Sequence, residues 1–415
     1  MNVKRVGRGI PERRRLLYGK TGHPAAGWQS VWADVVLHEK LGQHVRDPAD
    51  ELLTAPGIDS QLTAGLRPQN LYIRVPAVLV RQKRWSSVLM WRFLMRRFNA
   101  VLAVPLGVFF CGHFCLQAAE PTTVAGAIVK ASDFLIEQGQ DPDGSFSPQV
   151  GPAVTALAVA ALVESGTPAD HPAIAKGLSY LLSFRQPDGG ICRPESAVAN
   201  YETSIALMAL VACNADGRHD DTIAAARRFI SGIQWDGEEG KQPADPAYGG
   251  AGYGSHKRPD LSNTAFLIEA LKSAGAGTDD PAIQRALVFV SRTQNLEGPH
   301  NTLPYATKNP DGGFYYTPAN GGESQAGETP AGGLRSYGSM TYAGLKSMIY
   351  AGVAKDDPRV VAATDWLKRH YTFSENPGLG KAGLYYYLHT AAKALDALGQ
   401  ETFTDADGNE HRWRQ

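Results

Sequence analysis

The chain has 415 residues, enough for one large domain or two ordinary ones, and 43% of them are apolar. Charged residues make up 20%, and the formal net charge at pH 7 is zero, which argues against nucleic acid or an anionic membrane surface as the partner. Only four cysteines are present, so a disulfide framework is not expected to hold the fold. The sequence leaves open whether Cys192 and Cys213 pair with each other.

Residues 1–94 are rich in arginine and show no repeat and little helical periodicity. We therefore expect them to be unstructured or a spurious extension of the gene. Residues 95–119 place a basic Met-Arg-Arg before an apolar run and end in small residues, which is the order of a secretory signal peptide. They predict translation from Met90 or Met95 and a secreted or periplasmic protein. The alternative is a membrane anchor, for which the apolar run is somewhat short.

One helical pattern recurs five times between residues 120 and 400. Each copy has a threonine with apolar residues four and seven positions later, which is the spacing of one helix face. The threonines are Thr155, Thr203, Thr264, Thr341 and Thr390. This recurrence predicts an array of supersecondary units, followed by a C-terminal tail at 401–415.

A second helix is expected before each threonine helix, ending in an aromatic and an aliphatic residue. Glutamine follows within a few residues, most clearly at Gln234 and Gln294, and Tyr371 takes its place in the fifth copy. The looser cases are Gln186 and either Gln138 or Gln140. Turns rich in Asp and Gly come next, such as Asn-Pro-Asp-Gly-Gly-Phe at 309–314, because Asp caps backbone groups and Gly adopts positive φ. Helix, turn and helix repeated in this way predict stacked helical hairpins.

Two of the connections are unusually long, at 235–259 and 296–337. Loops of that length in a compact array are usually functional or disordered. The first contains a glycine-rich run at 249–254, which is not a phosphate-binding loop because no Gly-Lys-Ser or Gly-Lys-Thr follows it.

The aromatic–aliphatic–glutamine helix end and the Asp-Gly-Gly-Phe turn together resemble the repeat of squalene–hopene cyclases, oxidosqualene cyclases and the β subunits of protein prenyltransferases. The resemblance covers about Val124 to Leu398. It implies an all-α fold, an α/α toroid with an inner ring of roughly parallel helices, an outer ring and a central cavity. Five hairpins are recognisable and six are possible, since such toroids commonly have about six. In the cyclases the repeat glutamine joins neighbouring hairpins, which implies a structural role for Gln186, Gln234 and Gln294.

The residue before each threonine is expected near the rim of this cavity. That position varies in polarity, and it is occupied by Val154, Glu202, Asn263, Met340 and His389. We take His389, Glu202 and Asp260 as candidate catalytic residues, although a helix cap is the favoured role for Asp260. The candidate ligand-binding residues are Asn263, Met340, Tyr337, Tyr385, Tyr386 and Tyr387. The three consecutive tyrosines follow an unusual segment at 375–380, which is where chemistry is to be sought first.

The known catalytic motifs of the resembling families are not found. His389 matches the prenyltransferase histidine that precedes a threonine, but Tyr337 and Ser339 stand where that zinc site has Asp and Cys, so we expect no metal and no cofactor. Squalene cyclases build a strong acid from an Asp-x-Asp-Asp motif. The Asp-x-Asp pairs at 141–143 and 405–407 look like turns, and the acidic pairs at 279–280 and 356–357 look like helix starts.

Two functions therefore remain open, because fold alone does not fix function. The first is binding or transformation of an apolar, isoprenoid-like molecule in the central cavity, with His389, Glu202, Asn263 and Asp260 at its rim. The second is a non-catalytic extracytoplasmic module that binds protein or polysaccharide through the long loops and the tyrosines at 385–387. A polysaccharide-acting toroid is a further alternative, with carboxylates such as Glu202 and Asp260 as acid or base.

Overall fold

The computed structural model describes residues 123–255 and 257–414. The segments expected to be a spurious extension (1–94) and a signal peptide (95–119) lie outside the described residues. Among the described residues helices predominate, and the named strands are a short antiparallel pair, β1 (Phe403–Thr404) and β2 (Glu410–His411). No helix in this part of the chain is long and apolar enough to cross a membrane.

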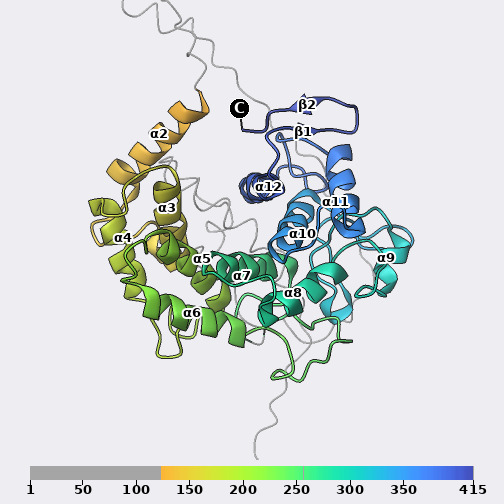
Figure 1. Cartoon of the computed structure of the whole chain (residues 1–415), viewed down its shortest axis with the longest axis horizontal. Coiled ribbons are helices and arrows are strands. Elements are labelled where there is room, and N and C mark those ends of the chain that lie inside the picture. Colours follow the sequence, from red (N-terminus) through yellow and green to blue (C-terminus); the bar gives the residue numbers. More distant parts are fainter. Residues whose placement is uncertain (1–122, 256, 415) are drawn as a thin grey trace, which may run out of the picture. The chain divides into compact units, whose positions relative to one another are not determined.

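The long helices alternate between an outer and an inner layer (Figure 1). The outer helices are α2 (Val124–Phe134), α4 (Pro172–Leu182), α6 (Asp220–Gly232), α8 (Pro281–Arg292) and α11 (Pro358–Arg369). The inner helices are α3 (Pro152–Glu164), α5 (Ala199–Ala212), α7 (Leu261–Ser273), α10 (Gly338–Tyr350) and α12 (Leu384–Leu398). The shorter elements are η2 (Leu135–Gly139), η3 (Pro148–Val150), α9 (Pro304–Lys308) and η4 (Ala319–Gly321).

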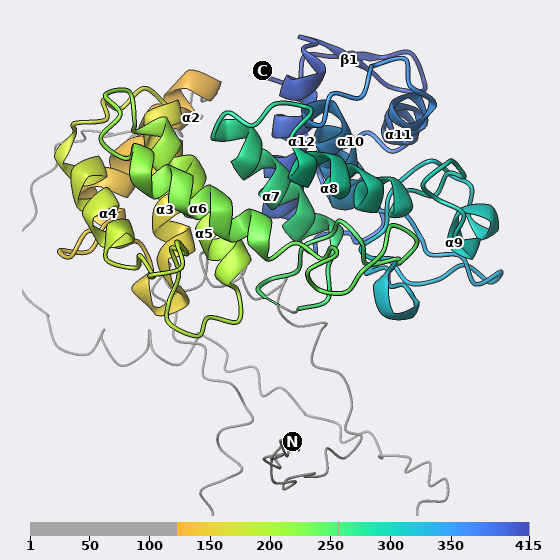
Figure 2. The same cartoon turned by 60° about the horizontal axis from the view of Figure 1, so that its bottom comes forward.

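The inner helices pack on one another in chain order, from α3 to α5, α7, α10 and α12. Each outer helix from α4 onward packs on the inner helix that precedes it, so successive hairpins interlock (Figure 2). This is the expected α/α toroid, with the five predicted hairpins. Each predicted threonine lies on an inner helix.

Three outer helices begin in the same way. α4, α8 and α11 have proline as their first residue, and the side chain before it accepts a hydrogen bond from the backbone N–H two residues on. Proline suits this position because its missing N–H has no helical partner there. The capping residues are His171, Asp280 and Asp357, so the interpretation of the acidic pairs at 279–280 and 356–357 as helix starts is confirmed.

The repeat glutamines join neighbouring hairpins. The amide nitrogen of Gln234 donates to Gly249 O at 2.8 Å and to Ala282 O on α8 at 2.9 Å. Gln294 donates in the same way to its own turn and to Arg359 O on α11, which confirms the predicted structural role of both. Gln186 differs, since its amide nitrogen donates to Phe184 O and Cys192 O within its own turn. Gln140 makes the interhairpin contact in the first copy, to Gly144 O and Ala173 O.

The repeat threonines of the inner helices form hydrogen bonds with the same turns. The hydroxyl of Thr264 accepts a hydrogen bond from Ala251 N at 3.0 Å, and Thr155, Thr203 and Thr341 accept from the equivalent backbone N–H of their own turns. The glycine-rich run at 249–254 therefore contains the third copy of the repeat turn, which the sequence had not revealed.

One glycine of each turn touches the next outer helix. Gly249 has φ +82°, and a Cβ on it would lie 1.9 Å from Arg285 O on α8. The three equivalent glycines also have positive φ and would place a Cβ within 3 Å of a backbone oxygen. They are Gly144, Gly189 and Gly312. Only glycine meets both requirements.

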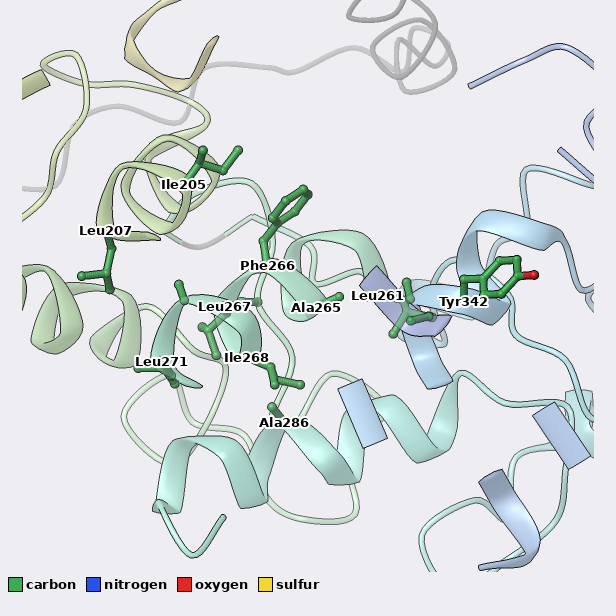
Figure 3. Close-up of a cluster of buried hydrophobic side chains, with 14 of the residues drawn as sticks. Ile205, Leu207, Leu261, Ala265, Phe266, Leu267, Ile268, Leu271, Ala286 and Tyr342 are labelled. Carbon is green, nitrogen blue, oxygen red and sulfur yellow. The ribbon is translucent and has the colours of Figure 1, made fainter. Parts of the chain in front are cut away.

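The core lies between the two helix layers. On α7, Ile268 points toward α8, where Ala286 lies, while Phe266 projects from another side of the helix (Figure 3). Cys192 and Cys213 are both buried and free, so they do not pair. No disulfide is therefore involved in the packing of this region.

The C-terminal residues 401–415, expected to be a tail, include the short sheet. Tyr371, which replaces glutamine in the fifth copy, stacks on Phe403 of β1 at 5.2 Å and on His411 of β2 at 4.3 Å between ring centroids. His411 also bonds Asp405 at 2.8 Å. The two strands thus cover the end of the array, as the terminal units of repeat proteins do.

Candidate functional site at the centre of the inner helices

Asp260 is the N-cap of α7. One carboxylate oxygen accepts from Asn263 N and the other from Asn263 Nδ2, both at 2.9 Å, so the favoured cap role is confirmed. Only 2% of the residue is exposed. Burial raises the pKa of Asp260 to about 6, against the opposing effect of the hydrogen bonds from Asn263 and Tyr316 and of the Arg258 charge.

Tyrosines surround this carboxyl group. The negative charge of Asp260 adds to burial in raising the pKa of Tyr253, Tyr316, Tyr337 and Tyr386. Two polar atoms beside it are buried and have no hydrogen-bond partner among the described residues, the hydroxyl of Tyr337 and Asn263 Oδ1. Since buried polar groups usually have a partner, these atoms are the ones a polar group of a ligand or a water molecule would satisfy.

An aromatic group lies next along the inner helices. Phe266 on α7 meets the edge of Tyr201 on α5, with ring centroids 5.1 Å apart, and Tyr386 on α12 at 6.4 Å. The hydroxyl of Tyr386 also lies 2.9 Å from Ser262 Oγ on α7. Three inner helices therefore bring aromatic rings together, and the Tyr201 and Tyr386 side chains are only partly buried.

Charged side chains follow farther along the same helices. Lys346 on α10 bonds the carboxylate of Glu269 on α7, and both are buried. Burial alone would raise the pKa of Glu269, but the Lys346 charge and hydrogen bond outweigh it and lower the pKa. Lys393 on α12 lies 3.9 Å from Glu269 Oε1 and 3.0 Å from Glu164 Oε1 on α3. Four inner helices thus contribute to one charged cluster.

His389 lies one turn before Lys393 on α12. Its surface is exposed to solvent, yet desolvation, followed by the positive charge of Lys346, lowers its pKa. His389 is therefore accessible to solvent and also close enough to other protein groups for desolvation to act on it. Leu157 on α3 and Tyr385 on α12 are also exposed, at 36% and 56%, although both belong to inner helices.

The other candidate residues lie in different surroundings. Glu202 is fully buried, and burial raises its pKa against the opposing effects of Ser196 and Arg193. Met340 and Tyr387 are in the core, and the hydroxyl of Tyr387 donates to Thr372 O at 2.6 Å. Of the three consecutive tyrosines, only Tyr386 reaches the aromatic group.

The segment 375–380 has a structural contact. The side chain of Asn376 accepts a hydrogen bond from Ser339 N at 2.9 Å, and Gly338 N donates to Pro377 O at 2.8 Å. Both N–H groups are in the first turn of α10, which has no side-chain cap of its own. The segment therefore supplies hydrogen-bond acceptors for the backbone N–H groups at the start of α10, which have no partner within the helix.

Sequence reasoning missed several residues of this centre: Tyr201, Ser262, Phe266, Glu269, Lys346 and Lys393. One signal was available, because Ser262, Phe266 and Glu269 are spaced i, i+4 and i+7 on one face of α7. Residues 260–263 also have the spacing of Asp-x-Asp-Asp, with serine and asparagine at the last two positions. No group of three or more His, Cys, Asp or Glu that could hold a metal ion occurs in the described part.

Comparison with known proteins agrees with this architecture. Residues 147–317 match the family model of the squalene–hopene cyclase C-terminal domain. Drimenyl diphosphate synthase of Streptantibioticus cattleyicolor is 28% identical over 204 residues, which is 46% of this chain and 35% of the relative. The chain therefore matches about a third of the length of that protein.

Solved structures of the type II terpene cyclase MstE from Scytonema are also similar. A variant in complex with geranylgeranyl dihydroxybenzoate is 16% identical, with a TM-score of 0.36 over 58% of this chain and 60% of that one. A variant with merosterolic acid A is 14% identical, with a TM-score of 0.39 over 66% and 82% of the two chains. The resemblance predicted from the repeats is confirmed by the family match, and the chain carries a terpene cyclase-like helical domain.

Proposed function

We propose that the centre of the inner helices binds an apolar, isoprenoid-like ligand. The observation that carries this proposal is the aromatic group of Tyr201, Phe266 and Tyr386, which lies between the buried carboxyl of Asp260 and the charged cluster around Glu269. Aromatic rings offer a large apolar surface, and their faces also favour cationic charge. A ligand pocket of this kind is mostly apolar with a few convergent polar groups.

The names of the similar proteins support the same ligand class. One is a synthase of drimenyl diphosphate, and another was solved with a geranylgeranyl compound. Whether this chain also transforms its ligand depends on a proton donor. Asp260 is the candidate, because its pKa of about 6 leaves a fraction of the carboxyl protonated near neutral pH. Ser262 and Asn263 supply no further carboxyl group beside it.

The test is isothermal titration calorimetry of the purified protein with geranylgeraniol and, separately, with a linear saturated alcohol of similar length. We expect saturable binding with preference for the isoprenoid, and a loss of at least tenfold in affinity for Tyr386→Leu. The matched control is Phe373→Leu, an exposed aromatic change outside the centre, which should leave the affinity unchanged. Equal binding of both alcohols, or equal effects of both variants, would contradict the proposal.

Catalysis is tested separately with the same protein. Incubation with geranylgeranyl diphosphate or a prenylated phenol, followed by mass spectrometry of the extract, detects cyclised products. If Asp260 donates a proton, any product formed by the wild type disappears in Asp260→Asn, whereas ligand binding remains.

A second candidate function has one observation in its favour. A surface cavity of about 480 Å³ lies beside the start of α5 and the long loop 235–259. Its wall combines the cations Arg193 and Lys257 with Asp188, Glu195 and the ring of Phe229, which would suit a polar extracytoplasmic ligand such as a sugar. Glycan-array binding that is lost in Phe229→Ala, while Tyr386→Leu retains it, would favour this function.

We also propose that the protein is exported and that its mature N-terminus lies close to residue 119. The order of basic, apolar and small residues in 95–119 supports this proposal. N-terminal sequencing of protein purified from its natural source tests it. A mature N-terminus well upstream of Ala118 would contradict it.

A further inference from the structure

The ring of inner helices has one junction unlike the others. α3, α5, α7, α10 and α12 pack successively through buried side chains. The first and last of them, α3 and α12, are instead joined by the ion pair between Lys393 Nζ and Glu164 Oε1, at 3.0 Å. We call this junction the α3–α12 seam.

The seam is polar and accessible, whereas the other junctions are filled by buried side chains, the Lys346–Glu269 pair among them. Glu164 exposes 60% of its side chain and Lys393 exposes 31%. The inner-helix side chains on its two sides are also exposed, namely Leu157 and Ala161 on α3 and Tyr385, His389 and Ala392 on α12. An exposed ion pair contributes only about 0–1 kcal/mol, so it holds the two helices far more weakly than a packed interface does.

Lys393 has a second carboxylate within reach. Its ammonium group lies 3.9 Å from Glu269 Oε1 on α7, whose other oxygen is bonded by Lys346. If the contact to Glu164 breaks, the ammonium group can move onto Glu269 and remain paired. Opening the seam therefore leaves no unpaired buried charge, which would otherwise be costly.

We propose that the α3–α12 seam is the passage by which a ligand reaches the centre of the inner helices, and that Lys393 is its latch, exchanging Glu164 for Glu269 when the passage opens. This inference rests on the proposed function for its ligand. The exchange of partners, by contrast, depends only on the charges of the seam.

The latch is tested without any ligand. Spin labels at Ala161→Cys and Ala392→Cys, in the full chain with Cys111→Ser and Cys115→Ser, report the distance between α3 and α12 by double electron–electron resonance. Cys192 and Cys213 are buried and leave the labelling selective. We expect Glu164→Gln to broaden the distance distribution and add longer distances. An unchanged distribution would overturn the latch.

The passage is tested by stopped-flow binding of geranylgeraniol. Glu164→Gln should raise the association and dissociation rates together by roughly two- to fivefold, as expected for loss of an exposed ion pair, with little change in Kd. Added salt should raise the wild-type rates but not those of the variant, because salt screens exposed charges. The matched control is Asp365→Asn, which breaks the exposed pair with Lys368 on α11 and should change nothing.

The outcomes separate the two proposals. Binding with rates that Glu164→Gln leaves unchanged refutes the passage while the proposed function stands. If the wild type binds no isoprenoid, the proposed function and the passage both fall, and the spin-label distances still decide whether Lys393 is a latch.

Discussion

Lys346 on α10 and Glu269 on α7 form an ion pair inside the ring, and neither side chain exposes more than 7% of its surface. The Lys346 ammonium also lies 5.9 Å from the centre of the Phe266 ring. This pair joins two inner helices whose other contacts are mostly apolar, so the buried charge of Lys346 depends on Glu269 for its solvation.

We predict that Glu269→Gln lowers the free energy of unfolding by about 3–5 kcal/mol, because it leaves the charge of Lys346 buried and uncompensated. Lys346→Met should cost less, because Lys393 lies 3.9 Å from Glu269 Oε1 and keeps that carboxylate paired. The double variant should cost much less than the sum of the two. Urea unfolding of all four proteins measures the coupling. A loss below about 1 kcal/mol for both single variants would show that water reaches the pair.

Gly249 and Gly240 offer a matched comparison. Both have positive φ, but a Cβ on Gly249 would lie 1.9 Å from Arg285 O, whereas nothing lies within 4 Å of one on Gly240. We expect Gly240→Ala to cost only the conformational penalty, about 1–2 kcal/mol, and Gly249→Ala to cost several kcal/mol more because α8 must move. Thermal and urea unfolding measure the difference, and equal costs would mean that the turn and α8 are not in firm contact.

Gln294 should matter more than Gln186. Gln294→Leu removes hydrogen bonds to two carbonyls, one in the turn and one on α11, and should lower the free energy of unfolding by about 2–4 kcal/mol. Gln186→Leu affects one turn only, and we expect about half that loss. Hydrogen exchange supplies a second measurement, since Gln294→Leu should speed exchange at the start of α11 and Gln186→Leu should not.

Asp260 predicts a pH dependence of stability. Its pKa in the folded protein is about 6, above the value of about 3.9 for an unfolded chain. The folded state therefore binds more protons between these values, so stability falls as pH rises from about 4 to about 6, by roughly 3 kcal/mol in all.

Asp260→Asn tests this dependence and keeps a good N-cap. Its stability should change less between pH 4 and pH 6 than that of the wild type, when measured by urea unfolding at each pH. Asp280→Asn, an equivalent change at the start of α8, should retain the wild-type slope. A slope that Asp260→Asn leaves intact would mean that other groups carry the dependence.

The hairpins could be predicted from sequence because each depends on residues close together in the chain. A glutamine after the outer helix, a glycine with positive φ and a threonine that bonds the turn recur in the same order. One copy of the repeat therefore helps to recognise the next. The third turn was missed because Tyr248 stands before Gly249, where the other turns have the aspartate that marks them. Distance from the helix does not explain the miss, since Gly312 lies 18 residues after Gln294 and its turn was recognised.

The centre was harder to predict, because its members come from different hairpins. Glu269, Lys346 and Lys393 lie on three helices far apart in the chain. No local spacing in the sequence determines how each helix is oriented about its own axis, and therefore which of its side chains face the centre. Taking the residue before each threonine as the rim selected Met340, which is in the core. His389 at the same position is exposed, because it lies on the side of α12 that borders the α3–α12 seam.

The interhairpin contacts of Gln140, Gln234 and Gln294 have a consequence for biosynthesis. Each of these glutamines bonds an outer helix that is translated after it, so these three hairpins complete their hydrogen bonds only when the following helix has been synthesised. In the fifth hairpin, Tyr371 instead stacks on the strands at 403–411. Loss of this short sheet, for example through a premature stop codon, would leave the ring of Tyr371 without the two side chains that stack on it.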